Sequence, residues 1–189
     1  MEADGRFDAV SDFCRRWSAL PNKQRYRLVP ELPLHEMQLA AVTHPSPWVR
    51  CGCLSFLDHY ASDDSTHVFL GALSDPVPFV RSMALHGLSC ERCRTEELRV
   101  AEVVPVLTRV LADDDSAEVR HKVVPILMDL AGRSPSAREA LETASLGDED
   151  PFVRQVATAA LEGRQQEARR SRHALLRRAR TRKGKAAIG

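Results

Sequence analysis

The chain has few aromatic residues, no long apolar run and an odd number of cysteines, and each of these features excludes a class of protein. Only 5% of its 189 residues are aromatic although 43% are hydrophobic, so Leu, Val and Ala must form most of any core. No run of 18 apolar residues occurs, and the acidic N-terminus lacks the apolar segment of a secretory signal. Five cysteines do not indicate a disulfide framework. We therefore expect a cytoplasmic protein without a membrane span.

A short motif recurs four times and predicts the fold. In each copy a turn is followed by Val-Arg and then by an apolar helix, and the Val-Arg pairs are spaced by 31, 39 and 34 residues, at 49–50, 80–81, 119–120 and 153–154. Periods of this length are typical of arrays of helical hairpins. Each second helix has apolar residues at steps of four, such as Val80, Ala84 and Leu88, which form one stripe. One hairpin cannot bury enough area alone, so we expect stacked hairpins with a shared core.

The array is predicted to occupy residues 34–163 as four repeats. Residues 1–33 are expected to form N-terminal capping helices, because the apolar residues of 7–20 lie on one helical face. Residues 164–189 are predicted to be a basic, partly helical or disordered C-terminal tail. The first helices of the four hairpins are expected at 34–42, 65–73, 102–112 and 136–146.

The turn motif resembles the HEAT repeat family, especially its short bacterial, phycobilisome-lyase-type branch, whose repeats carry Asp-Pro-x-x-x-Val-Arg-x-x-Ala. The matching residues are Asp75, Pro76, Val80, Arg81 and Ala84, and, with a shorter spacing, Asp150, Pro151, Val153, Arg154 and Ala157. The resemblance covers about residues 34–163 and implies an all-α fold, a right-handed α-solenoid of stacked antiparallel helical hairpins. It also implies a non-catalytic scaffold that engages a protein partner through its concave inner surface.

Enzymes also occur among HEAT-like proteins, but this chain lacks their signatures. HEAT-type deoxyhypusine hydroxylases hold two irons with several His-Glu pairs, whereas only His35-Glu36 occurs here. HEAT-like alkylpurine DNA glycosylases use Trp and Asp in a basic groove, whereas Trp48 is interpreted here as a core residue equivalent to Phe79 and Phe152. No GxSxG elbow, P-loop or HExxH motif occurs. No catalytic residue is predicted, and an enzyme is the third hypothesis.

The pattern HxxxCxxC at His86, Cys90 and Cys93 is the strongest chemical signal. On a continuing helix the three side chains would share the face opposite the core. The repeat offset places His59 and Asp129 at the position of Cys90, so His59, His86, Cys90 and Asp129 are predicted to line the partner-binding inner surface. Imidazole and thiolate donors favour zinc, with His86, Cys90, Cys93 and His59 as candidate ligands and Asp129 as an outer ligand or acceptor. A solvent-facing His86 and a redox-active CxxC are the alternatives.

Charge is distributed unevenly along the chain although its net value is only +1. Residues 164–189 contain ten basic residues and one acidic residue, a net charge of +9, which leaves −8 on the preceding 163 residues. Part of this negative charge lies in the turns, where Asp75, Asp115 and Asp150 are expected to cap the second helices. Stacking of the hairpins is expected to line these acidic turns along one edge.

Three roles are open for the basic tail. It is a solvated extension, a segment that docks on acidic protein surface, or a segment that binds nucleic acid or another anionic surface. It has no aromatic residue to stack on bases, so nucleic-acid binding would tolerate any sequence. The residues assigned to this last role are Arg169, Arg170, Arg172, Arg177, Arg178, Arg180, Arg182, Lys183 and Lys185.

Overall fold

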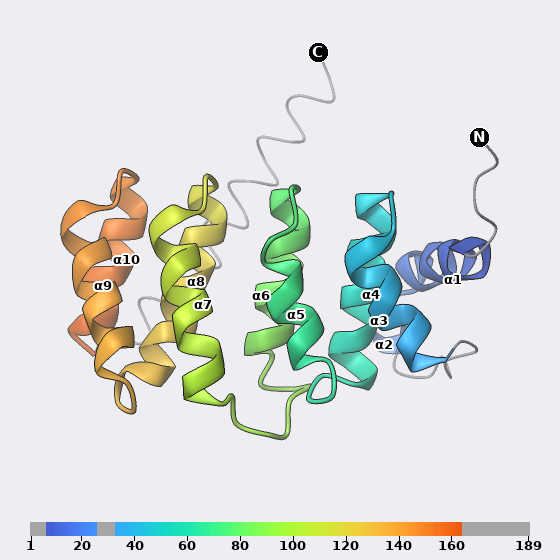
Figure 1. The fold of residues 1–189 in the computed structure, drawn as a ribbon, viewed down its shortest axis with the longest axis horizontal. Helices are drawn as coiled ribbons and strands as arrows, with labels where there is room; N and C mark the ends of the chain where they lie inside the picture. The colour runs from blue at the N-terminus through green and yellow to red at the C-terminus, as the bar shows by residue number, and fades with distance from the viewer. Residues whose placement is uncertain (1–6, 26–32, 164–189) are drawn as a thin grey trace, which may run out of the picture. The chain divides into compact units, whose positions relative to one another are not determined.

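A computed structural model describes residues 7–25 and 33–163 of the chain (Figure 1). Within these ranges the regular structure is helical and no strand is formed, so the all-α prediction is confirmed. The chain divides into two compact units, Met1–Leu98 and Arg99–Gly189. No helix of the described ranges is long and apolar enough to cross a membrane.

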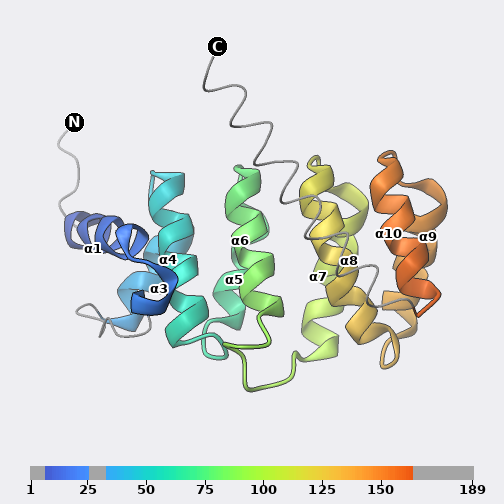
Figure 2. The same cartoon turned by 180° about the vertical axis from the view of Figure 1, so that it is seen from behind.

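The first unit contains two helical hairpins, an N-terminal helix that packs on the first hairpin, and a short second helix. Its described helices are α1 (Asp8–Ala19), α2 (Asn22–Arg25), α3 (Leu34–Thr43), α4 (Pro47–Tyr60), α5 (Thr66–Ala72) and α6 (Pro78–Ser89). The hairpins α3–α4 and α5–α6 stack with α3 against α5 and α4 against α6. Helix α1 packs on α3 and α4 (Figure 2). This arrangement agrees with the predicted stacking of antiparallel hairpins.

The second unit repeats the same arrangement with two further hairpins. Its helices are α7 (Val100–Asp113), α8 (Ala117–Ala131), α9 (Pro135–Gly147) and α10 (Pro151–Leu161). Helix α7 packs on α9, and α8 packs on α10. Figure 2 shows the second helix of each hairpin, α8 and α10, side by side.

The core of each unit contains the predicted apolar stripes at four-residue steps, although Val49 and Leu161 at the outer ends of two stripes are only half-buried. Val80, Ala84 and Leu88 of α6 are buried. The second helices also bury residues beside the stripe, such as Phe56 and Leu85, because each packs both on its own first helix and on the other second helix of its unit. The stripe therefore identifies the centre of the interface and underestimates its width.

Helix α1 covers the first hairpin with the apolar face expected from the sequence. Trp17 meets Phe56 edge to face, with ring centroids 5.4 Å apart. Gly52 permits the close approach of α1 to α4, because a Cβ atom at this position would lie 3.0 Å from the Cβ atom of Cys14. The buried residues of α1 are Val10, Phe13, Cys14 and Trp17.

The arginine of each Val-Arg pair builds the turn before its helix. Its guanidinium donates to the carbonyl oxygen six residues earlier, from Arg50 to His44, Arg81 to Asp75, Arg120 to Asp114 and Arg154 to Asp148. The side chain of that earlier residue accepts a hydrogen bond from the backbone N–H two residues later. One turn design is thus built four times, once with histidine and three times with aspartate.

The predicted helix caps are wrong for two of three aspartates. Asp150 is the N-cap of α10 and accepts from two N–H groups of the first turn. Helix α6 instead has Val77 at its N-cap, two residues after Asp75, and α8 has Ser116 there, one residue after Asp115. Both helices begin later than predicted, because the turn places one or two more residues between the aspartate and the first helical residue.

Two of the turn aspartates join consecutive hairpins through buried ion pairs. Asp75 accepts hydrogen bonds of 2.6 and 2.8 Å from Arg50 of the preceding hairpin, and the two side chains are only 4% and 9% exposed. Asp148 accepts two bonds of 2.9 Å from Arg120 in the second unit. At both positions the carboxylates neutralise buried guanidinium groups, so they add little exposed negative charge to the predicted acidic edge.

Candidate metal centre

Four of the predicted site residues lie around the ends of α4 and α6 in the first unit. His59 lies in the last turn of α4 and His86 in the last turn of α6. Helix α6 ends before Cys90, and Cys93 follows in a turn closed by its N–H bonding to the Cys90 carbonyl at 3.1 Å. The prediction of one continuous helical face is therefore wrong, since the helix ends before both cysteines.

A buried carboxylate that the sequence analysis missed lies between these residues. The side chain of Asp58 is 0% exposed, and within the described residues neither of its oxygens has a hydrogen-bond partner. Its Oδ2 atom lies 3.3 Å from Nε2 of His86 and 3.4 Å from Nδ1 of His59. Potential ligand atoms of Asp58, His86 and Cys90 lie within 4.8 Å of one another, as do those of Asp58, His59 and Cys93. These two groups share Asp58.

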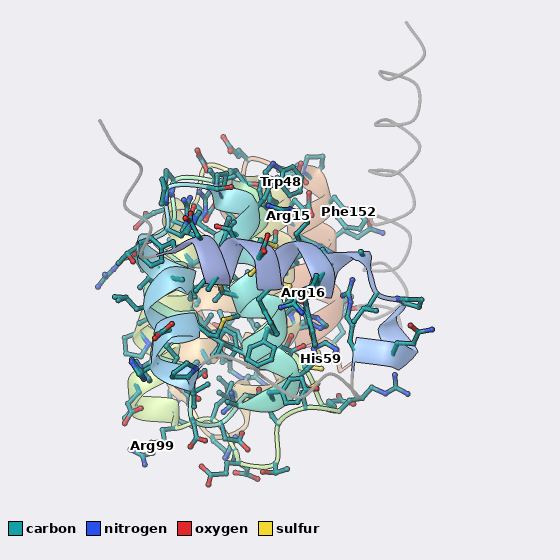
Figure 3. All side chains as sticks on the ribbon, turned by 90° about the vertical axis from the view of Figure 1, so that its right-hand side faces the viewer. Arg15, Arg16, Trp48, His59, Arg99 and Phe152 are labelled. Carbon is teal, nitrogen blue, oxygen red and sulfur yellow. The ribbon has the colours of Figure 1, made fainter. Side chains whose placement is uncertain are left out.

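The ring of His59 is held by its surroundings in α1 and α4. Its Nδ1 lies 2.9 Å from the carbonyl oxygen of Ser55, which can only accept, so Nδ1 carries the proton. Trp17 of α1 packs edge-on against the imidazole, with ring centroids 5.5 Å apart. Figure 3 shows His59 and Trp48 toward opposite ends of α4. The imidazole is thus oriented beside the Asp58 carboxylate.

The segment that carries the two cysteines is fixed to the loop after α4. Asp63 accepts hydrogen bonds from the N–H and O–H groups of Thr95 and from the N–H of Glu96, at 3.1, 2.6 and 3.3 Å. Burial favours the neutral carboxyl group, but these bonds outweigh it and lower the pKa of Asp63. Arg94 donates to the Ser62 carbonyl at 3.0 Å. The position of the cysteine segment is therefore set by contacts outside the cluster.

The remaining predicted site residues lie elsewhere. Asp129 is an exposed residue of α8 in the second unit and is not one of the side chains around Asp58. The nine tail residues proposed for anion binding lie outside the described residues. Their roles stay predictions.

Trp48 is not the core residue that the repeat comparison predicted. Its side chain is 73% exposed and stacks on Phe79 of the next hairpin, with ring centroids 4.6 Å apart and planes at 28°. Phe152, the equivalent residue in the second unit, is half-buried against His121 at 4.8 Å. Trp48 and Phe152 both lie in the first turn of the second helix of a hairpin, before the buried stripe begins. The exposure of a side chain there depends on what the turn of the adjacent hairpin places beside it.

Asp58 could have been suspected from one sequence signal. It directly follows the stripe residue Leu57 and precedes His59, so an acidic residue sits at the edge of a buried face. That signal is weak, because a polar residue at a helix end is normally solvated. His86, whose imidazole contacts the Asp58 carboxylate, lies 28 residues later in the sequence.

The fold and its turns define the chain as an all-helical repeat protein, in which hairpins of one design are joined by Arg-Asp pairs. Residues 92–162 match the family model described as HEAT repeats. The resemblance to this family is thereby confirmed over that part of the chain. Comparison with curated proteins and with solved structures found no match.

Proposed function

We propose that this chain is a non-catalytic scaffold that binds a protein partner, with Trp48 as a principal contact. The exposed indole on Phe79 is the observation that carries this proposal. A Trp side chain offers a large apolar area with few rotatable bonds, and Trp is enriched among the residues that dominate protein interfaces. Covering the indole with an apolar side chain of the partner would remove this area from water.

The aromatic pair lies on a preorganised platform. Pro47 and Pro78 occupy the first turns of α4 and α6 and restrict the backbone beside each ring. The Arg50–Asp75 ion pair joins the same two hairpins at 2.6 Å. Since little side-chain or loop ordering is needed on binding, more of the contact energy appears as affinity.

The inner-surface residues predicted from the repeats belong to the same proposal as further contacts. His59, His86 and Cys90 lie in the first unit, and Asp129, in the second unit, is proposed as a contact by itself. Trp48 supports the proposal more directly, because exposed aromatic area rather than polarity distinguishes the centres of interfaces.

The test compares the full-length protein with Trp48→Ala and with Leu146→Ala, a control that removes an exposed apolar side chain from the second unit. Cell extract passed over each immobilised protein identifies the candidate partner, and calorimetry with that purified partner measures affinity. We expect Trp48→Ala to weaken binding by about 30-fold or more, as truncation of a dominant contact costs about 2 kcal/mol. Leu146→Ala should bind as the unmodified protein does. Equal affinity of all three proteins would refute the role of Trp48.

Nucleic-acid binding through residues 164–189 is the alternative function, and the net charge of +9 on this segment favours it. A generic DNA fragment titrated at several salt concentrations tests it with the full-length protein and with a variant whose nine predicted arginines and lysines are glutamines. The alternative predicts a log-log salt slope of about −0.9 per neutralised phosphate for the unmodified chain, and no binding by the variant. Absence of binding at low salt would reject it.

A further inference from the structure

We propose that Asp58, His86, Cys90 and Cys93 bind one zinc ion at the C-terminal ends of α4 and α6. The proposal goes beyond protein binding, because these residues lie toward the opposite ends of α4 and α6 from Trp48 and Phe79. It depends on three observations. They are the unsatisfied Asp58 carboxylate, the spacing of the nitrogen and oxygen atoms, and the composition of the donor set.

The buried Asp58 carboxylate requires a cation or a proton. Burying such a group without hydrogen bonds is strongly unfavourable, and buried polar groups are nearly always satisfied in native proteins. Within the described residues both oxygens lack a hydrogen-bond partner while the side chain is completely buried. A metal ion between this carboxylate and the neighbouring imidazole and thiol groups would satisfy all of them at once.

The distances fit shared coordination better than direct hydrogen bonding. Charge-assisted N–H···O bonds are usually about 2.7–2.9 Å long, whereas Nε2 of His86 lies 3.3 Å from Oδ2 of Asp58. Two ligands of one tetrahedral zinc ion, each about 2.0–2.1 Å from it, lie about 3.3–3.4 Å apart. The observed separation between oxygen and nitrogen is therefore that of two ligands on one ion.

The donor set favours zinc over the hard divalent cations. Thiolate and imidazole ligands select zinc, whereas magnesium and calcium prefer shells made of oxygen. Cys90 belongs to the same group as Asp58 and His86, with all ligand atoms within 4.8 Å. Cys93 follows Cys90 at the CxxC spacing that commonly holds zinc, and lies within the same distance of Asp58. Asp58, His86 and Cys90 form one group, and Cys93 is close to Asp58 but is not a member of that group. With a small movement of Cys93 toward the ion, two sulfurs, one nitrogen and one oxygen would complete a tetrahedral shell.

His59 is assigned as a positioning residue. The ring nitrogen of His59 that lies 3.4 Å from Oδ2 of Asp58 is Nδ1. This nitrogen already donates to the Ser55 carbonyl at 2.9 Å, so it is not assigned as a ligand. With four protein ligands and no open position the ion would be structural, and it would tie the ends of α4 and α6 to the segment after α6.

The experiment uses full-length protein purified without chelator. Mass spectrometry of the elements should find about one zinc ion per chain, and replacement by cobalt should give the visible bands of a tetrahedral site together with a thiolate charge-transfer band. Competition with a chromophoric chelator measures zinc affinity for Asp58→Asn, His86→Ala, Cys90→Ser and Cys93→Ser, each expected to weaken binding at least 100-fold. His59→Ala should weaken it about 10-fold, as loss of a supporting residue does.

Matched controls separate ligand loss from general damage. Cys51→Ser and His67→Ala replace the same residue types in α4 and α5 outside the cluster and should bind zinc normally. If a ligand variant does not fold, the rate of thiol alkylation is measured instead on the unmodified protein with and without zinc. Bound zinc should slow the alkylation of Cys90 and Cys93 but not that of Cys51. Unchanged alkylation of Cys90 and Cys93 with zinc added, or equal loss of zinc in the controls, would overturn the site. These results are independent of the Trp48 binding test.

Discussion

Replacing Asp75 with alanine distinguishes an inter-hairpin ion pair from a helix cap. Loss of a cap costs about 1 kcal/mol, whereas removing one partner of a buried ion pair costs about 3–5 kcal/mol. Asp75 receives two hydrogen bonds from Arg50, at 2.6 and 2.8 Å, and one from the Val77 N–H at 2.8 Å. Hydrogen bonding to this carboxylate also raises the pKa of Arg50. The ion pair therefore predicts the larger loss.

The remaining contacts of Arg50 place the expected value at the low end of that range. Its Nη1 still donates to the carbonyl oxygens of His44 and Pro45, at 2.7 and 3.1 Å, so the guanidinium keeps part of its hydrogen bonding. We expect the free energy of unfolding of the first unit to fall by about 3 kcal/mol. For a unit of this size, Met1–Leu98, that corresponds to a decrease in Tm of roughly 12–24 °C.

Urea unfolding followed by tryptophan fluorescence is the suitable assay, because both tryptophans of the chain, Trp17 and Trp48, lie in the first unit. Asp150→Ala, which removes a true cap in the second unit, should cost only about 1 kcal/mol by circular dichroism. The double variant Arg50→Met/Asp75→Ala should be less destabilised than the sum of the single variants. A loss of 1 kcal/mol or less for Asp75→Ala, or strict additivity, would refute the ion-pair argument.

Two further predictions concern the first unit. Gly87→Ala should lower the free energy of unfolding by about 1–3 kcal/mol in urea, because the new Cβ atom would lie 2.4 Å from the Phe69 ring. Gly71→Ala, whose new Cβ atom would have no contact closer than 3.9 Å, should not lower it. Equal effects of the two substitutions would contradict this packing. Burial lowers the pKa of His44, whose Nδ1 accepts the Ser46 N–H. Its neutral form therefore stabilises the fold fully above the ordinary histidine pKa of about 6.5, and this contribution should be lost as the pH falls below that value. Urea midpoints measured by fluorescence across this range should fall less for His44→Asn, and parallel curves would show that His44 does not contribute.

The sequence by itself determined the all-helical hairpin array. A helix presents every third or fourth residue to one side, so the periodic apolar residues around Val80, Ala84 and Leu88 specify a buried stripe without knowledge of any neighbour. The fourfold recurrence of Val-Arg likewise predicts stacking, because each hairpin has the same unsatisfied apolar face. It also indicated His59, His86, Cys90 and Cys93 as chemically notable residues.

Only the tertiary structure decided what the polar and exposed residues do. Asp75 contacts a guanidinium 25 residues away, Asp58 meets an imidazole 28 residues away, and Trp48 is exposed because the next turn presents Phe79 beside it and does not cover it. No local periodicity encodes these relations. A charge or an aromatic ring gains its role from the partner that packing brings within a few ångströms, and that partner depends on the angle and offset between neighbouring hairpins.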